Sequence, residues 1–126
     1  MIPGKGYPQS RVDIETLERL SEFGGKKVTI EMIRLFIAYT PNRLKECCDG
    51  FYAKNARAVE VAAHSLRSTC GQMGVFGMQK LAEEIEGAAE TKSLDGLEPL
   101  VTRLVKEFDA VKLELEVKKM ELEAGG

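Results

Sequence analysis

The sequence contains a single histidine, His64, and no tryptophan. One histidine excludes a carboxylate-bridged di-metal bundle, because that site needs Glu-x-x-His on two helices. It also leaves no pair of histidines for a zinc site. No glycine-rich loop opens a helix, so the sequence has no recognisable ATP site. We therefore expect neither a metal centre, nor a cofactor of its own, nor a kinase activity.

The sequence also lacks a basic block and a long apolar run. Its 18 basic residues nearly balance 20 acidic ones, for a net charge of −2, so nucleic acid is not an expected partner. No apolar stretch approaches the ~20 residues that span a bilayer. Residues 1–10 have no apolar secretory core. We expect no membrane segment.

Cysteine is scarce and odd in number: Cys47, Cys48 and Cys70. Their spacing suits neither metal ligation nor a pairing of the two neighbours. We interpret all three as reduced thiols in a cytoplasmic protein.

At 126 residues the chain is expected to form one domain. Residues 1–10 carry two prolines and two glycines and are interpreted as a flexible leader. Residues 11–118 should form the folded domain. Residues 119–126 are highly charged, end in two glycines and are interpreted as a frayed tail.

The apolar periodicity predicts a short first helix and a long second one. Ser10 or Asp13 can cap the first helix, and the glycines at 24–25 should end it. The second helix should run over about 27–52. Pro41 lies inside it and should bend rather than end it, since the stripe resumes on the same face; a stop just before the proline is the alternative. That stripe comprises Met32, Leu35, Phe36, Tyr39, Leu44, Cys47, Cys48 and Phe51.

The third helix should start after Asn55, carry His64, and end or kink at Gly74. A fourth should follow over about 75–90. Its inward face is expected to comprise Met78, Leu81, Ala82, Ile85 and Ala88, and its solvated acidic face Glu83, Glu84 and Glu86.

Asp95 and Glu98 are spaced as a capping box for the last helix, with Pro99 tolerable in its first turn. That helix has an a/d seam that breaks at Lys118. The seam fits packing within the bundle; a coiled-coil dimer is the alternative, and we expect a monomer. Its members are Leu97, Val101, Leu104, Phe108, Val111 and Leu115.

No segment carries a strand pattern, and short connections favour antiparallel neighbours. The predicted fold class is all-α: an up-and-down antiparallel four-helix bundle with a short additional N-terminal helix.

On a helical wheel, His64 falls outside the apolar face of its helix. Ser68 and Gly71, at i+4 and i+7, are small and should leave open surface beside the imidazole, and Arg67 at i+3 places a cation nearby. Glu60, four residues earlier, could hydrogen-bond the ring or be a plain surface charge. The apolar face comprises Ala56, Val59, Ala62, Ala63, Leu66, Cys70 and Met73.

The run His64-Ser65-Leu66-Arg67-Ser68, with Gly74 ten residues after the histidine, resembles the histidine-containing phosphotransfer (HPt) family. That family's pattern is His-x-Leu-Lys-Gly, followed by Gly at the tenth position after His. His64, Leu66 and Gly74 match it. Arg67 keeps the charge of the usual Lys, whereas Ser68 departs from the usual Gly.

The resemblance implies a phosphorelay intermediate that accepts and donates a phosphoryl group on His64. Its partners would be response-regulator receiver domains and a hybrid sensor histidine kinase, with Mg²⁺ held by the receiver. Arg67 would stabilise the phosphate. We expect the partner to contact the surface around His64, namely Glu60, Ser68, Gly71 and Gln72. The alternative, which Ser68 keeps open, is a non-catalytic helical interaction module that has lost phosphotransfer.

Overall fold

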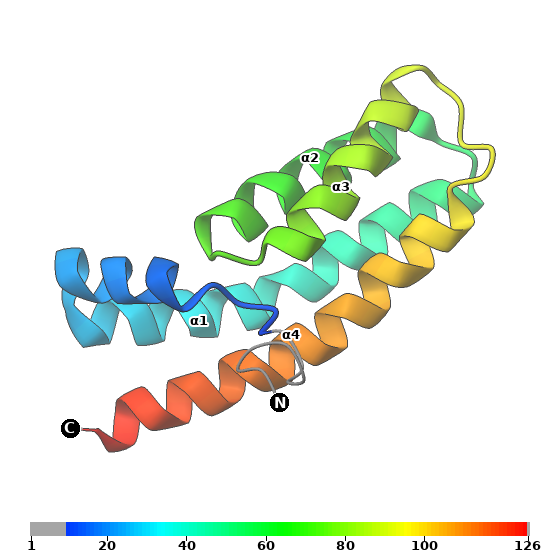
Figure 1. Cartoon of the computed structure of the whole chain (residues 1–126). Helices are drawn as coiled ribbons and strands as arrows, with labels where there is room; N and C mark the ends of the chain where they lie inside the picture. The colour runs from blue at the N-terminus through cyan, green and yellow to red at the C-terminus, as the bar shows by residue number, and fades with distance from the viewer. Residues whose placement is uncertain (1–9, 126) are drawn as a thin grey trace, which may run out of the picture.

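The computed structural model describes residues 10–125, which form four helices: α1 (Ile14–Tyr52), α2 (Ala56–Gln72), α3 (Phe76–Glu90) and α4 (Glu98–Ala124). Consecutive helices run antiparallel through short connections (Figure 1). α1 and α3 each pack against both α2 and α4, whereas α2 and α4 do not touch and occupy diagonal corners. Within the described residues there is no strand, and the predicted four-helix bundle is confirmed.

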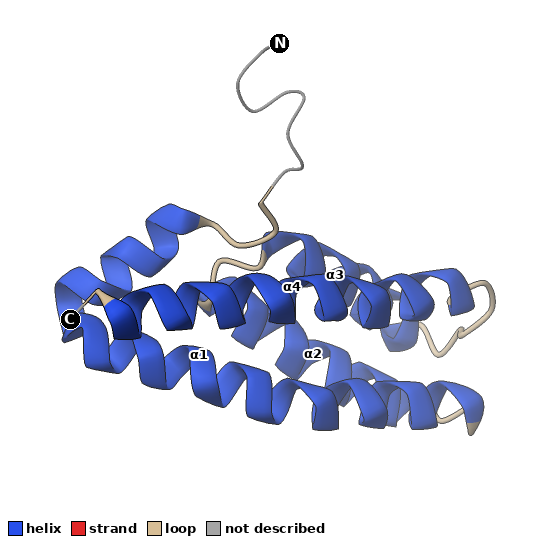
Figure 2. Ribbon diagram, turned by 90° about the horizontal axis from the view of Figure 1, so that it is seen from below, coloured by secondary structure: helices blue, strands red, loops and turns tan. Residues whose placement is uncertain are grey.

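α1 consists of two helical segments joined at a kink. Asp13 caps its start by accepting a hydrogen bond from the Thr16 amide at 3.1 Å. Gly25 interrupts the helical dihedral angles with φ 83° and ψ 171°, a conformation that essentially only glycine adopts. The first segment therefore turns away from the rest of α1 (Figure 2), at the position where the sequence predicts a short helix to end. Pro41 lies inside the second segment, which continues to Tyr52; the expectation that Pro41 does not end the helix is correct.

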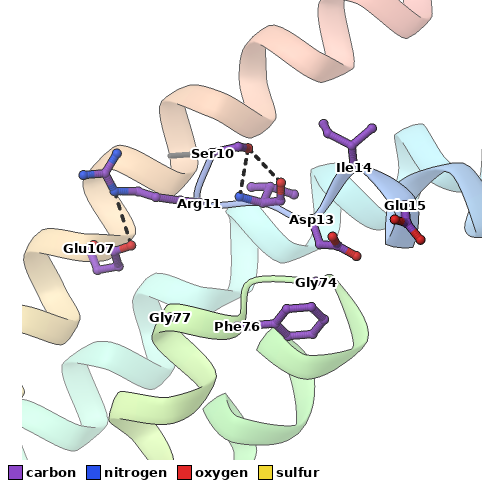
Figure 3. Close-up of a pocket in the computed structure, with 10 residues that line it drawn as sticks. Ser10, Arg11, Asp13, Ile14, Glu15, Gly74, Phe76, Gly77 and Glu107 are labelled. Carbon is purple, nitrogen blue, oxygen red and sulfur yellow. Dashed lines mark hydrogen bonds and ion pairs between the residues drawn. The ribbon is translucent and has the colours of Figure 1, made fainter. Parts of the chain in front are cut away.

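The segment before α1, residues 10–13, contacts the rest of the bundle (Figure 3). The Asp13 amide donates to the Gly74 carbonyl at 2.9 Å, and the Arg11 guanidinium pairs with Glu107 at 3.3 Å. Gly74 has a φ of 74°, and a Cβ there would lie 2.7 Å from the Thr16 Cβ. Gly74 is thus required both by the backbone conformation and by the close approach of the N-terminal segment.

The hydrophobic core is built from the apolar faces that the sequence predicts on α2 and α4. Leu66 is fully buried, and Leu81 of α3 is 7% exposed. On α2 the buried residues are Val59, Ala62, Ala63, Leu66 and Cys70, followed by Met73 at the cap. All six members of the α4 seam are buried: Leu97, Val101, Leu104, Phe108, Val111 and Leu115. The seam therefore packs inside this bundle.

The predicted capping box of α4 is wrong. Leu97 occupies the N-cap position and makes no side-chain cap hydrogen bond. The Glu98 carboxylate instead accepts a hydrogen bond from the Tyr52 hydroxyl at 3.3 Å. Pro99 lies in the first turn, as expected. A tertiary partner at the end of α1 has thus replaced the local cap.

The C-terminal end of α4 is longer than the sequence indicated. Residues 119–124, assigned to a frayed tail, are helical. Lys119 pairs with Glu123 at 3.5 Å, and Lys118 with Glu121 at 3.8 Å. Such pairs one turn apart support a helix that has few core contacts. Most of the predicted leader, residues 1–9, lies outside the described residues.

Candidate functional site

His64 projects from the middle of α2, and its side chain is 61% exposed. The opposite face of α2 packs in the core, where Leu66 is fully buried. His64 Nδ1 lies 2.8 Å from Oε2 of Glu86, which comes from α3. The imidazole is thus held at one nitrogen and open to solvent elsewhere.

Glu86 is buried, with 7% of its surface exposed. We predicted that it faces water together with Glu83 and Glu84, which are indeed exposed; for Glu86 the prediction is wrong. Glu86 follows buried Ala82 by four residues and precedes buried Ala89 by three. It therefore occupies the inward stripe of α3. That spacing was the signal that could have identified it.

Arg67 is the second partner of the Glu86 carboxylate. Its Nε lies 3.3 Å from Glu86 Oε1. The pair lacks hydrogen-bond alignment, and Oε1 accepts no hydrogen bond within residues 10–125. We therefore describe the contact as an ion pair. A buried carboxylate needs such compensation, so His64, Arg67 and Glu86 form one connected site between α2 and α3.

The contact with Glu86 distinguishes the two nitrogens of the His64 ring. An ionised carboxylate only accepts hydrogen bonds. Opposite an ionised Glu86, Nδ1 would carry the proton and donate to Oε2. In a neutral ring the other nitrogen, Nε2, then keeps its lone pair. The ring is thus held through Nδ1 while most of the side chain stays exposed to solvent.

Glu60 does not contact the ring, so the suggested hydrogen bond to His64 is absent. Its carboxylate lies 3.4 Å from Arg57, one turn earlier on α2. The suggestion failed because Glu86 already occupies the Nδ1 position. Glu60 is partly exposed and remains close to His64 along the helix.

The two small residues after His64 differ in their surroundings. Ser68 is exposed one turn on. Gly71 is half-buried, and a Cβ there would lie 2.6 Å from the side-chain nitrogen of Gln79 on α3. The expectation that Gly71 lies on open surface is therefore wrong, because a side chain of α3 packs against it.

An apolar groove runs between α1 and α2, and Ser65, the residue after His64, is part of its lining. We placed Leu35 and Tyr39 in the core stripe of α1, but they are 37% and 63% exposed. Leu35 and Tyr39 line this groove from α1, and Gln72 lines it from α2. The groove residues are Met32, Leu35, Phe36, Tyr39, Thr40 and Arg43 of α1 with Ser65, Thr69, Gln72 and Met73 near α2.

The cysteines take no part in this site. All three are free thiols. Burial raises the pKa of Cys70 to about 12 and that of Cys47 to about 11. Both thiols therefore stay protonated at neutral pH and are poor nucleophiles.

The described residues contain neither a cluster of metal ligands nor a membrane-spanning helix. Residues 10–125 hold no group of three or more side chains placed to ligate a metal ion. In the same range, no helix has both the length and the apolar character needed to cross a membrane.

The chain matches the model of the Hpt domain family over residues 31–114. It is similar in structure to histidine-containing phosphotransfer protein B (HptB) from Pseudomonas aeruginosa PAO1, with a TM-score of 0.84 and 21% identity, covering 88% of this chain and 96% of that one. It is also similar to the HPT domain of a sensor hybrid histidine kinase from Shewanella, with a TM-score of 0.77 and 17% identity, covering 89% and 96%. A search of curated proteins found no match.

The family match spans most of the bundle and includes the helix that carries His64. It confirms the resemblance found in the sequence, and it favours phosphotransfer over an interaction module that has lost it. Hpt domains are phosphocarriers rather than kinases. This chain belongs to the Hpt domain family, and its function is histidine phosphotransfer in a two-component phosphorelay.

Proposed function

We propose that His64 is the phosphorylated residue and that the phosphoryl group is carried on its Nε2 atom. The observation that supports this most strongly is the 2.8 Å contact between Nδ1 and the buried Glu86. It occupies one ring nitrogen and leaves the other available on an exposed side chain.

The transfer needs no cofactor held by this chain. The Nε2 lone pair attacks the phosphorus of an aspartyl phosphate on the partner. An N–P bond forms, the acyl P–O bond breaks, and its electron pair leaves on the aspartate carboxylate. Such transfers depend mainly on positioning and charge neutralisation. The reverse reaction passes the phosphoryl group to the next aspartate.

Glu86 is proposed as a positioning residue for this step. The ring becomes cationic when Nε2 forms its bond to phosphorus, because Nδ1 keeps its proton. The Glu86 carboxylate at 2.8 Å then faces that developing charge. A fixed charge in a buried position stabilises a charged state more strongly than one exposed to water.

Arg67 is proposed to stabilise the transferred phosphate. It lies on the same side of α2 as His64 and pairs with Glu86 Oε1 through Nε. The guanidinium carries further N–H donors beyond Nε, which can bind phosphate oxygens. Arg67 would therefore contact both the Glu86 carboxylate and the phosphoryl group on His64.

The proposed partners are response-regulator receiver domains, which hold Mg²⁺ themselves, and a hybrid sensor histidine kinase. We assign their docking to the groove between α1 and α2, together with exposed Ser68 and the partly exposed Glu60. Leu35 and Tyr39 expose apolar surface there, one helix away from His64. The protein is proposed to act as a monomer in the cytoplasm, where free thiols remain reduced, without kinase activity of its own.

The test is phosphoryl transfer from a phosphorylated receiver domain to the full chain, followed as an acid-labile label. Wild type should be labelled, and His64→Gln should not, because Gln can still donate to Glu86 but cannot accept the phosphoryl group. Matching thermal unfolding curves would show that the fold is intact. Label retained on His64→Gln would refute the assignment.

Glu86→Gln provides the finer test. Gln retains an acceptor oxygen of similar shape for Nδ1 but removes the charge. We expect slower transfer at unchanged partner affinity, since Glu86 is buried and out of the partner's reach. An unchanged phosphoryl-transfer rate would mean that the charge of Glu86 has no role in the reaction.

A further inference from the structure

The C-terminal half of α4 exposes a second apolar stripe, on the side opposite its buried seam. Leu113, Val117 and Met120 are 65%, 56% and 64% exposed. With Ala110 and Ala124 they are spaced three and four residues apart, as in an a/d seam. The buried seam on the other face already satisfies the bundle. Leu113 and Val117 line a shallow pocket beside Val12 and Ile14, but the stripe stays largely exposed among the described residues.

Two rows of carboxylates border this stripe. With 100° per residue, one row lies on each side of it, and the members of each row are seven residues apart. One row comprises Asp109, Glu116 and Glu123, and the other Glu107, Glu114 and Glu121. These are the positions that face a partner helix across a coiled-coil seam.

Cations within the chain leave part of this border unpaired. Arg11 lies 3.3 Å from Glu107 and 3.9 Å from Glu114. On the other side, Asp109 and Glu116 form no ion pair within residues 10–125. Lys118 pairs with Glu121 and Lys119 with Glu123, so the border is open to cations from another molecule at Asp109 and Glu116.

We propose that the outer face of α4 binds an amphipathic helix whose apolar residues are bordered by lysine or arginine. Apolar residues of that helix would pack along Leu113, Val117 and Met120, and its cations would meet Asp109 and Glu116, the two carboxylates without an ion pair within the described residues. The stripe from Leu113 to Ala124 is about 16 Å long at ~1.5 Å per residue, which is enough for a contact of about two helical turns or more.

The rows of carboxylates argue against a second copy of this chain and against a membrane surface as the partner of this face. In a second copy of this chain, acidic rows would face acidic rows in either orientation, and like charges across such a seam oppose pairing. A membrane surface usually carries negative charge and attracts basic, not acidic, amphipathic helices. A basic partner helix fits both the apolar and the charged pattern.

This face is separate from the phosphotransfer site. α4 lies diagonally across the bundle from α2 and does not contact it. A helix bound on α4 leaves His64 and the groove between α1 and α2 accessible. The bound helix would thus hold this chain beside another component while phosphotransfer proceeds.

The test uses full-length chain and a synthetic peptide of about three heptads, with Leu at the a and d positions and Lys at e and g. Two controls are the same peptide with Glu at e and g, and a scrambled peptide of identical composition. Fluorescence anisotropy at physiological salt should show binding of the Lys peptide alone, weakening as salt rises. Equal binding of the scrambled or Glu peptide, or no binding of the Lys peptide, would overturn the proposal.

Matched variants locate the binding. Val117→Glu should lower affinity for the Lys peptide at least ~tenfold, and Glu116→Gln should lower it less. Tyr39→Glu places the same charge on the other exposed apolar surface and should leave affinity unchanged. Equal effects of Val117→Glu and Tyr39→Glu would overturn the location. Self-association of the wild type that Val117→Glu abolishes would assign the stripe to a second copy.

Discussion

Two faces of this bundle expose large apolar side chains, and their borders differ. The groove beside His64 exposes Leu35 and Tyr39 among hydroxyl and amide side chains and one arginine. The outer face of α4 exposes Leu113 and Val117 between carboxylates. Apolar area provides attraction on both faces without selecting a partner. The polar and charged side chains around each face determine which partner binds. The two faces should therefore bind different molecules.

The largest expected effect separates buried from exposed leucine. Leu66 is fully buried on α2, and Leu113 is 65% exposed on α4. Leu66→Ala should lower the free energy of unfolding by about 2–5 kcal/mol because it leaves a cavity. Leu113→Ala should change it by about 0.5 kcal/mol or less. Denaturant unfolding measures both, and a large loss in Leu113→Ala would mean that the outer stripe belongs to the core.

Next in size is the contribution of Arg67 to transfer. Charge-assisted hydrogen bonds contribute roughly 1.5–3 kcal/mol, so Arg67→Ala should slow phosphoryl transfer by about 10- to 150-fold. Arg67→Lys should slow it less. Arg57→Ala is the matched control on the same helix, since within residues 10–125 Arg57 forms an ion pair with Glu60 alone. If the transfer rates of Arg67→Ala and Arg57→Ala agree, Arg67 has no role in the reaction.

A smaller effect distinguishes the two faces directly. Tyr39→Glu places a charge in the groove beside His64 and should reduce the transfer rate at low receiver concentration by about tenfold. Val117→Glu places the same charge on α4 and should leave the rate unchanged. Transfer kinetics against receiver concentration measure both. Impaired transfer in Val117→Glu alone would reverse the assignment of the faces.

The smallest expected effect concerns Ser68. Ser68→Gln should slow transfer a few-fold by placing bulk one turn after His64, with little change in melting temperature, because Ser68 is exposed. Ser68→Gly restores the residue usual in the family and should transfer at least as fast as wild type. Gly71 is unsuitable for this test, because a side chain there would strike Gln79. Faster transfer by Ser68→Gln would show that the partner uses added contact rather than open space.

Much of the fold follows from local pattern. The periodic apolar faces of α2 and α4 predicted their buried residues, and the glycines at 24–25 marked the kink in α1. These features depend on the spacing of residues within one helix. The capping-box prediction is wrong, and the Glu98 carboxylate accepts a hydrogen bond from Tyr52 instead. Tyr52 lies 46 positions away, so no local pattern reveals this contact.

The site was predicted only in part. His64 and Arg67 were identified from their places on α2, but Glu86 was assigned to a solvated face. Its spacing from Ala82 and Ala89 indicated burial, whereas its charge and two acidic neighbours indicated exposure. A buried carboxylate is stable only with partners, and those partners come from another helix. Sequence reasoning therefore located the proposed nucleophile and missed the carboxylate that contacts it.

The most direct test of this account is the position of the phosphoryl group on the ring. ³¹P NMR of the phosphorylated full chain distinguishes phosphorus bound to Nε2 from phosphorus bound to Nδ1. Because Nδ1 is held by Glu86 at 2.8 Å, we predict a single phosphohistidine signal from Nε2, absent in His64→Gln. A signal from phosphate on Nδ1 would contradict the account.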